Sequence, residues 1–238
     1  MTIELPDIEE HDVALIPSRR TVRSGTSTHP DLTRPLEQRL AIGGPWSRLL
    51  DPRALEGDEL EPDARRFLEY EGTVADFFLV QVTCSFRPEN DEPFAKAVLR
   101  ITLSASHPEA AAPIAWSMKP DRLTTPTTLS RTVKLDGSLK VFGVGLGAGL
   151  EQSREQPDEI FVEAFFEGLS NPTWEVTRTS NAEISGLQRF ILVVRAAKGA
   201  GANGRATLGA TISKRRFGVI PYEAALGGDA APLEFVLS

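Results

Sequence analysis

The sequence predicts an all-β protein, mainly antiparallel, built around a two-layer β-sandwich of about eight to ten strands. Three observations lead to this fold class. Short segments after residue 76 alternate apolar and polar residues with a period of two, as half-buried strands do. Glycine, proline and asparagine separate nearly all of these segments. No long segment in this region carries the 3.6-residue periodicity of an amphipathic helix.

The first 75 residues differ from this pattern and are predicted to form an N-terminal arm, leaving residues 76–238 for the sandwich. The arm is polar and rich in Pro, Arg and Glu. Two short helices are expected in it. One covers residues 36–42 and ends at the glycines and proline of residues 43–45. The other covers residues 62–70, with Asp63 in its first turn and Gly72 as a cap.

One cluster of large apolar residues interrupts the polar arm and needs a surface to bury against. Burial of such a side chain contributes about 1.5–3 kcal/mol before ordering costs. We therefore expect the cluster to dock, either on the chain's own sandwich or on a protein partner, including a second copy of the chain. Its members are Leu36, Leu40, Ile42, Trp46, Leu49 and Leu50.

Residues 96–105 give the clearest strand pattern. Leu99, Ile101 and Leu103 are expected in the core. The alternate positions Lys96, Arg100 and Thr102 are expected to be largely exposed. A glycine-rich stretch at residues 197–204 is expected to be the loop of a hairpin. The remaining strand candidates are residues 77–86, 114–118, 129–135, 139–150, 160–167, 173–179, 187–197, 205–217 and 233–237.

Residues 141–150 alternate four glycines with apolar residues, and three interpretations of this segment stay open. A strand face without side chains lets a second layer approach closely, which favours a central strand covered by aromatic side chains. Gly143, Gly145 and Ala148 also match the dinucleotide-binding pattern G-x-G-x-x-[GA]. A dinucleotide site needs a long helix after this motif. From Ala148 only about nine residues remain before Pro157, which is too short, and the surrounding segments are predicted strands without the βαβ pattern. The third interpretation is a membrane-inserting hairpin.

The sequence carries no recognisable catalytic centre, so no catalytic, metal-binding or cofactor-binding residue is predicted. His11, His29 and His107 lie far apart and lack zinc-ligand spacing. The serine-hydrolase elbow and the phosphate-binding P-loop motif are both missing. Cys84 shares the apolar face of its predicted strand with Val82 and Phe86, as a buried small hydrophobe does.

Charge and composition limit the classes of partner. The formal net charge of −7 argues against a nucleic-acid surface, which needs clustered positive charge. The acidic N-terminus has no secretory pattern, and no apolar run approaches the roughly 18 residues of a spanning helix. A single cysteine does not require an oxidising compartment. We therefore expect a cytoplasmic protein and no membrane partner.

The preferred function is a non-enzymatic binding or assembly module that acts through protein–protein contact or self-association. Tryptophan is enriched at binding hot spots, so Trp116 and Trp174 are either interface anchors or packed side chains. The candidate interaction residues are Trp46, Leu49, Leu50, Trp116 and Trp174. Two alternatives stay open. One is a small-molecule or carbohydrate-binding sandwich, including an enzyme whose carboxylates only the fold assembles. The other is a membrane-surface or pore-forming protein using residues 141–150.

Overall fold

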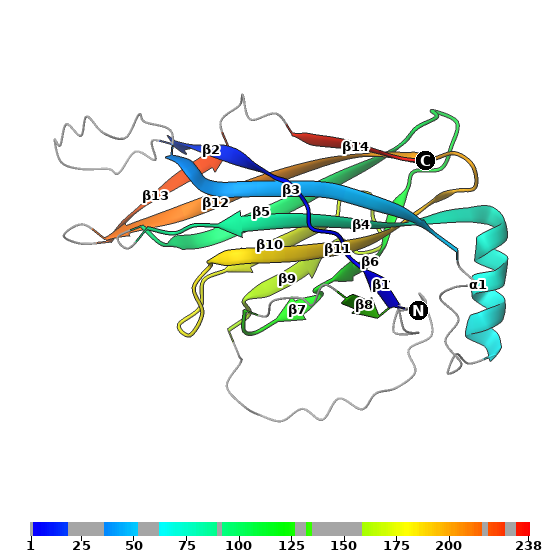
Figure 1. The fold of residues 1–238 in the computed structure, drawn as a ribbon, viewed down its shortest axis with the longest axis horizontal. Helices are drawn as coiled ribbons and strands as arrows, with labels where there is room; N and C mark the ends of the chain where they lie inside the picture. Colours follow the sequence, from blue (N-terminus) through cyan, green and yellow to red (C-terminus); the bar gives the residue numbers. More distant parts are fainter. Residues whose placement is uncertain are drawn as a thin grey trace.

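The computed structural model describes residues 2–18, 36–51, 62–89, 92–126, 132–134, 159–215, 219–226 and 232–238. Within these ranges the chain is mostly antiparallel β-structure with one helix, and two sheets pack against each other (Figure 1). The predicted all-β sandwich is confirmed. The glycine-rich segment 141–150, with its three interpretations, lies outside the described residues.

In the described part of the chain, the first sheet contains five strands, and its middle strand has an antiparallel neighbour on each edge. Its order is β6 (Ile114–Lys119), β11 (Gly186–Ala197), β4 (Ala75–Phe86), β3 (Leu36–Leu50) and β2 (Glu10–Ser18). Helix α1 (Pro62–Val74) leads directly into β4. A separate pair of strands is formed by β1 (Thr2–Glu4) and β8 (Thr132–Lys134).

The second sheet continues the same ladder, because β13 pairs with β2 of the first sheet. Its order is β13 (Val219–Leu226), β12 (Ala202–Arg215), β5 (Phe94–Ala105), β10 (Thr173–Thr177), β9 (Val162–Phe165) and β7 (Arg122–Leu123), with β14 (Leu233–Leu237) beside β12. The ladder begins at β6 and ends at β7, which are consecutive in the chain. Residues 120–121 join these two end strands.

The main core lies between the two sheets and confirms the strand pattern predicted for residues 96–105. Leu99, Ile101 and Leu103 are buried, and Arg100 and Thr102 are exposed. Lys96 is half-buried, since its ammonium group forms an ion pair with Glu175 on the neighbouring β10. The facing residues of β4 and β11 that complete this core include Phe78, Val80, Val82, Phe190 and Leu192.

A second, smaller core covers the outer face of the first sheet. Residues from the N-terminal segment, β3, β4, β6 and β11 form it, and Phe67 of α1 packs against it. Strand β4 is therefore buried on both faces, which explains its consecutive apolar residues 77–80. The buried members are Leu5, Leu50, Ala75, Phe77, Leu79, Trp116, Ile191 and Val193.

The helix expected at residues 36–42 is wrong, whereas the one expected at residues 62–70 is present and extends to Val74. Residues 36–50 form strand β3, which is hydrogen-bonded to β2 on one edge and β4 on the other. Arg39, Leu40, Ala41 and Ile42 are all buried, as in a central strand covered on both faces. Strand β3 of the predicted arm thus pairs with β4.

The connection at residues 198–201 is not the hairpin loop that the glycines suggested. Strand β11 pairs with β4 and β6, whereas β12 pairs with β5, β13 and β14. The connection therefore carries the chain from the first sheet to the second. Gly199 and Gly201 have positive φ angles of 69° and 65°, which glycine adopts without steric cost.

Candidate functional site

Trp174, one of the predicted interaction residues, lies in the main core. Its side chain is fully buried, and its ring lies 5.3 Å from that of Phe190, measured between centroids. The indole Nε1–H donates a hydrogen bond to the Pro120 carbonyl oxygen at 2.9 Å. With its apolar surface packed and its one donor satisfied, Trp174 acts as a structural residue.

Trp116 lies in the smaller core beneath helix α1. Its ring is stacked on Phe67, with centroids 6.1 Å apart, and meets the edge of Phe77 at 5.4 Å. The Arg195 guanidinium lies over the indole at 5.9 Å, and its Nε donates to the Glu71 carboxylate at 2.6 Å. Trp116 and the Arg195–Glu71 pair thus attach α1 to the first sheet.

The three predicted interaction residues on β3 do not form one exposed patch. Leu50 is buried in the smaller core and Trp46 is half-buried against it. Leu49 is 54% exposed. Among the members of the apolar cluster whose side chains the structure describes, Leu40, Ile42 and Leu50 are buried within the chain's own sandwich, and only Leu49 presents a large exposed surface.

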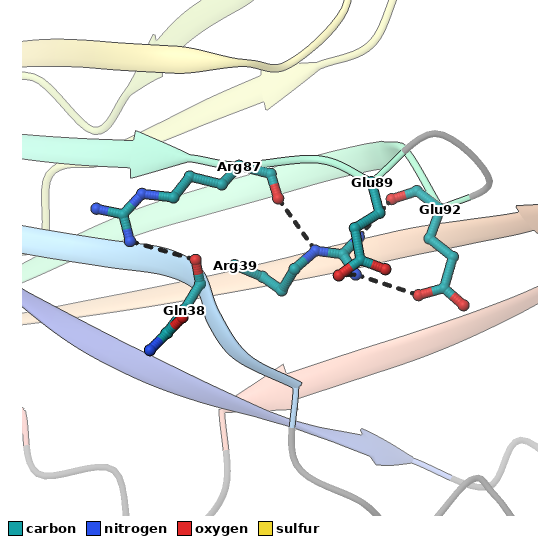
Figure 2. Close-up of polar contacts among 5 residues, drawn as sticks. All are labelled: Gln38, Arg39, Arg87, Glu89 and Glu92. Carbon is teal, nitrogen blue, oxygen red and sulfur yellow. Dashed lines mark hydrogen bonds and ion pairs between the residues drawn. The ribbon is translucent and has the colours of Figure 1, made fainter.

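A polar cluster joins β3 to the connection between β4 and β5 (Figure 2). The Arg39 side chain is only 5% exposed. Its Nε donates to the Arg87 carbonyl oxygen at 3.0 Å, and its Nη2 donates to the Glu92 carbonyl oxygen at 2.9 Å. Its Nη1 lies 3.1 Å from Glu89 Oε1 and 3.3 Å from Glu92 Oε2.

The Arg87 side chain points the opposite way from this cluster, as Figure 2 shows. It donates to the Gln38 carbonyl oxygen at 3.2 Å and to Asp12 Oδ1 at 3.0 Å. The Arg39 guanidinium is engaged by protein acceptors on three sides. A buried arginine satisfied in this way fixes two segments together, so we assign the cluster a structural role.

A different segment, residues 165–169 from the last residue of β9 into the connection to β10, exposes three large apolar side chains close together. We call it the aromatic turn. Phe165 is 37% exposed, Phe166 is 51% exposed and Leu169 is 52% exposed. The two phenylalanine rings contact each other, with centroids 6.4 Å apart. Phe166 has a φ angle of 66°, in the left-handed region that costs an L-residue about 1–2 kcal/mol.

Backbone hydrogen bonds hold the aromatic turn against β6. The Leu169 N–H donates to the Phe166 carbonyl oxygen at 3.1 Å. Gly168 N–H donates to the Ala115 carbonyl oxygen at 2.7 Å, and Ala115 N–H donates to the Leu169 carbonyl oxygen at 2.9 Å. The Glu167 carboxylate accepts from the Met118 N–H at 3.3 Å. The exposed side chains are therefore presented by a fixed backbone.

Sequence reasoning missed this turn, because it treated residues 160–167 as one alternating strand. Two adjacent phenylalanines cannot both face the core of a strand, since neighbouring side chains point to opposite faces. Gly168 and the Asn171-Pro172 pair follow within six residues and are turn signals. Together these two features were the available signal for an exposed aromatic turn.

The surroundings of Cys84, Asp121 and Glu159 fix the protonation state of each side chain. Burial raises the pKa of the Cys84 thiol far above its usual range, aided by the nearby Glu10 carboxylate, so the thiol stays protonated and unreactive. Burial also raises the pKa of Asp121, but the Lys119 charge and backbone hydrogen bonds outweigh it and leave that pKa lowered. A backbone hydrogen bond from Ser180 lowers the pKa of Glu159. Both carboxylates are therefore ionised at neutral pH.

The described part of the chain has neither a metal-binding cluster of side chains nor a membrane-spanning helix. His, Cys, Asp and Glu side chains there do not gather in groups of three or more that could hold a metal ion. His11 and His107 are exposed, and His29 lies outside the described residues. Across the same ranges, no helix has the length and apolar character needed to cross a membrane.

Comparison with known proteins adds no family assignment. No protein-family model matches the chain, and no curated protein matches it significantly.

Proposed function

We propose that this protein is a non-enzymatic binding module that acts through protein–protein contact, with the aromatic turn at the centre of its contact surface. One observation carries the proposal: Phe166 combines an exposed aromatic ring with a strained backbone conformation, on a turn fixed by hydrogen bonds. Aromatic side chains supply much of the binding energy at protein interfaces.

Folding stability alone does not account for the residue type at position 166. Glycine or asparagine adopts a positive φ at lower cost than phenylalanine. The Phe166 ring regains little by packing, because half of the residue is exposed. A partner that covers the ring recovers apolar burial energy of about 25 cal/mol per Å². The fixed turn also reduces the entropy lost on binding.

The surface beside the turn extends it with small apolar residues. Ala111 and Ala112 are exposed and Ile114 is half-buried in the segment that leads into β6. The Ser170 hydroxyl donates to the Pro113 carbonyl oxygen at 2.6 Å and ties this segment to the end of the turn. A stable interface buries about 800 Å² per partner, which is more than the turn offers alone. In the proposed interface the turn therefore lies at the centre, and these neighbouring residues lie around it.

We also propose that the protein acts in a reducing compartment, such as the cytoplasm. The chain has a single cysteine, and Cys84 is buried in the main core. Such a chain forms no internal disulfide and gains nothing from an oxidising environment.

Site-specific photo-crosslinking tests the proposed contact surface. A photoreactive phenylalanine analogue replaces Phe166 in cells of the native host, and a matched chain carries it at Val236, an apolar residue that is 66% exposed on β14. We expect a discrete protein adduct from position 166 and none from position 236. The adduct's partner is then purified, and its dissociation constant is measured with the unmodified chain.

The substitution Phe166→Gly completes the test, because it removes the ring and relieves the positive φ. We expect binding to weaken about 30-fold, as for a hot spot worth about 2 kcal/mol, and the melting temperature to stay equal or rise. Val236→Ser is expected to leave the affinity within about twofold. Equal adducts from both positions, or an affinity that Phe166→Gly leaves unchanged, would overturn the proposal.

A further inference from the structure

Two buried polar side chains on the outer face of β4 lack hydrogen-bond partners. Gln81 is completely buried, and both its amide oxygen and its amide nitrogen are unpaired. The Thr83 hydroxyl, two residues further along the same face, is buried and unpaired as well. A buried amide or hydroxyl without a partner is unfavourable, since folding removes its hydrogen bonds to water and returns none. Gln81 and Thr83 thus form a strip of unpaired polar side chains on the outer face of the first sheet.

Residues 5–9 cover this strip, and we call them the strap. They connect β1 to β2 and cross the face of the first sheet, as the dark-blue trace in Figure 1 shows. Leu5 is buried in the smaller core at one end of the strap. At the other end Glu10 enters β2, and its carboxylate accepts a hydrogen bond from the Ser85 hydroxyl at 2.6 Å.

Two glycines of β3 let the strap lie directly on the sheet. A Cβ atom at Gly43 would lie 3.0 Å from the Glu9 carbonyl oxygen and would also strike the Thr83 hydroxyl. A Cβ atom at Gly44 would lie 2.8 Å from the Gln81 carbonyl oxygen and 3.5 Å from Ile8 Cδ1. The strap therefore passes over these two glycines, and Gly43 is the β3 residue paired with Thr83.

Two different kinds of contact hold the ends of the strap. Both ends are attached, by apolar burial of Leu5 and by strand pairing of β2 with β3. Its middle seals two unpaired polar side chains away from water, which opposes docking. Local opening of such a segment costs less free energy than global unfolding.

We infer that the strap is a displaceable cover, which lifts from the first sheet while the sandwich stays folded and admits water to Gln81 and Thr83. The inference concerns the outer face of β4 and does not depend on the proposed function of the aromatic turn. When the strap is lifted, a hydrogen-bond donor and an acceptor are both uncovered, because the Gln81 side-chain amide has an N–H donor and a carbonyl acceptor.

Hydrogen–deuterium exchange of the full chain tests the inference. In the unmodified protein, amides of the strap should exchange at least tenfold faster than those of β4 residues 79–83. Gln81→Met and Thr83→Val keep the side-chain size while removing the unpaired groups. We expect the double variant to slow strap exchange about tenfold, equivalent to about 1.4 kcal/mol in the opening equilibrium.

The control variants are Gln188→Met and Thr173→Val, at buried residues of the same two types that do have partners. Gln188 donates to the Ser185 carbonyl oxygen at 3.4 Å, and Thr173 donates to the Asn171 carbonyl oxygen at 3.2 Å. They should leave strap exchange unchanged. If Thr83→Val fails to fold, Gln81→Met alone gives the same comparison. Strap exchange that Gln81→Met leaves unchanged or accelerates, or that matches β4 in the unmodified protein, would refute the inference.

Discussion

At the scale of single residues, Asp76 fixes the connection that carries the chain between the two sheets. Its carboxylate accepts hydrogen bonds from Lys198 Nζ and from the Gly199 N–H, both at 2.7 Å. Burial raises the pKa of Asp76, but these two hydrogen bonds and the charge of Lys198 outweigh it, so the pKa lies below its ordinary value of 3.8. The folded state therefore favours the ionised carboxylate.

This shift predicts how Asp76→Asn changes stability with pH. Because the folded pKa is depressed, the stabilisation is complete above the unfolded pKa and disappears as the pH falls through the folded pKa. We expect Asp76→Asn to lower the free energy of unfolding by about 1 kcal/mol at pH 7. Urea denaturation should show the difference narrowing below about pH 4. A difference that stays constant down to pH 2 would contradict this role of Asp76.

At the scale of elements, a single glycine determines how the last strand lies against β12. Gly204 of β12 is buried, and its partner across the pair is Phe235 of β14. A Cβ atom at position 204 would collide with the Phe235 ring. The ring therefore occupies the space that any larger residue would need, which is the role expected from a strand glycine.

Gly204→Val should overpack this contact and lower the free energy of unfolding by about 1–3 kcal/mol. Gly209→Val is the matched control, because a Cβ atom at Gly209 on the same strand meets nothing within 4 Å. Denaturant melts of the control should stay within about 0.5 kcal/mol of the unmodified protein. Equal effects of the two substitutions would show that the Phe235 contact is not tight in solution.

Strand β3 shows why an apolar pattern can mislead at this scale. Gly43 lies opposite Thr83 and Trp46 lies opposite Gln81, so β3 has one extra residue between these pairs. Such a bulge shifts the alternation by one position. Leu40 therefore belongs to the main core, whereas Trp46 and Leu50 belong to the smaller core on the other face. The even spacing of these residues does not reveal this change of face.

At the scale of the whole molecule, β3 and β2 connect the first sheet to the second through β13. Deleting residues 1–50 removes both strands and the buried residues Leu5, Leu40, Ile42 and Leu50. Their burial contributes about 6–12 kcal/mol, which is comparable to the whole net stability of a typical domain. We expect the truncated chain to show no cooperative melt and to bind a hydrophobic dye.

Deletion of residues 1–4 is the control for this truncation, because it removes only β1 from the described structure. The shorter deletion should keep a cooperative transition. If the chain without residues 1–50 melted cooperatively and bound no dye, strands β2 and β3 would be dispensable for the sandwich.

The candidate site was less predictable than the fold, for a physical reason. Aromatic residues follow similar local patterns whether they are buried or exposed, so Trp116 and Trp174 resembled interface anchors although both are packed. The alternation of residues 160–167 predicts a strand at Phe166, yet this residue is half exposed at a positive φ. Exposure depends on which distant segments cover a side chain, and one sequence does not contain that information.

The sequence alone determined the class of this protein, because alternation and turn residues act over a few neighbouring positions. It therefore predicted the all-β sandwich, the buried and exposed positions of residues 99–103, and the helix that begins at Pro62. Tertiary structure decided that residues 36–50 form a central strand and that the connection from β11 to β12 joins the two sheets. It also decided that Gln81 is buried. These features depend on pairing between strands distant in sequence and on covering of faces, which local side-chain patterns do not encode.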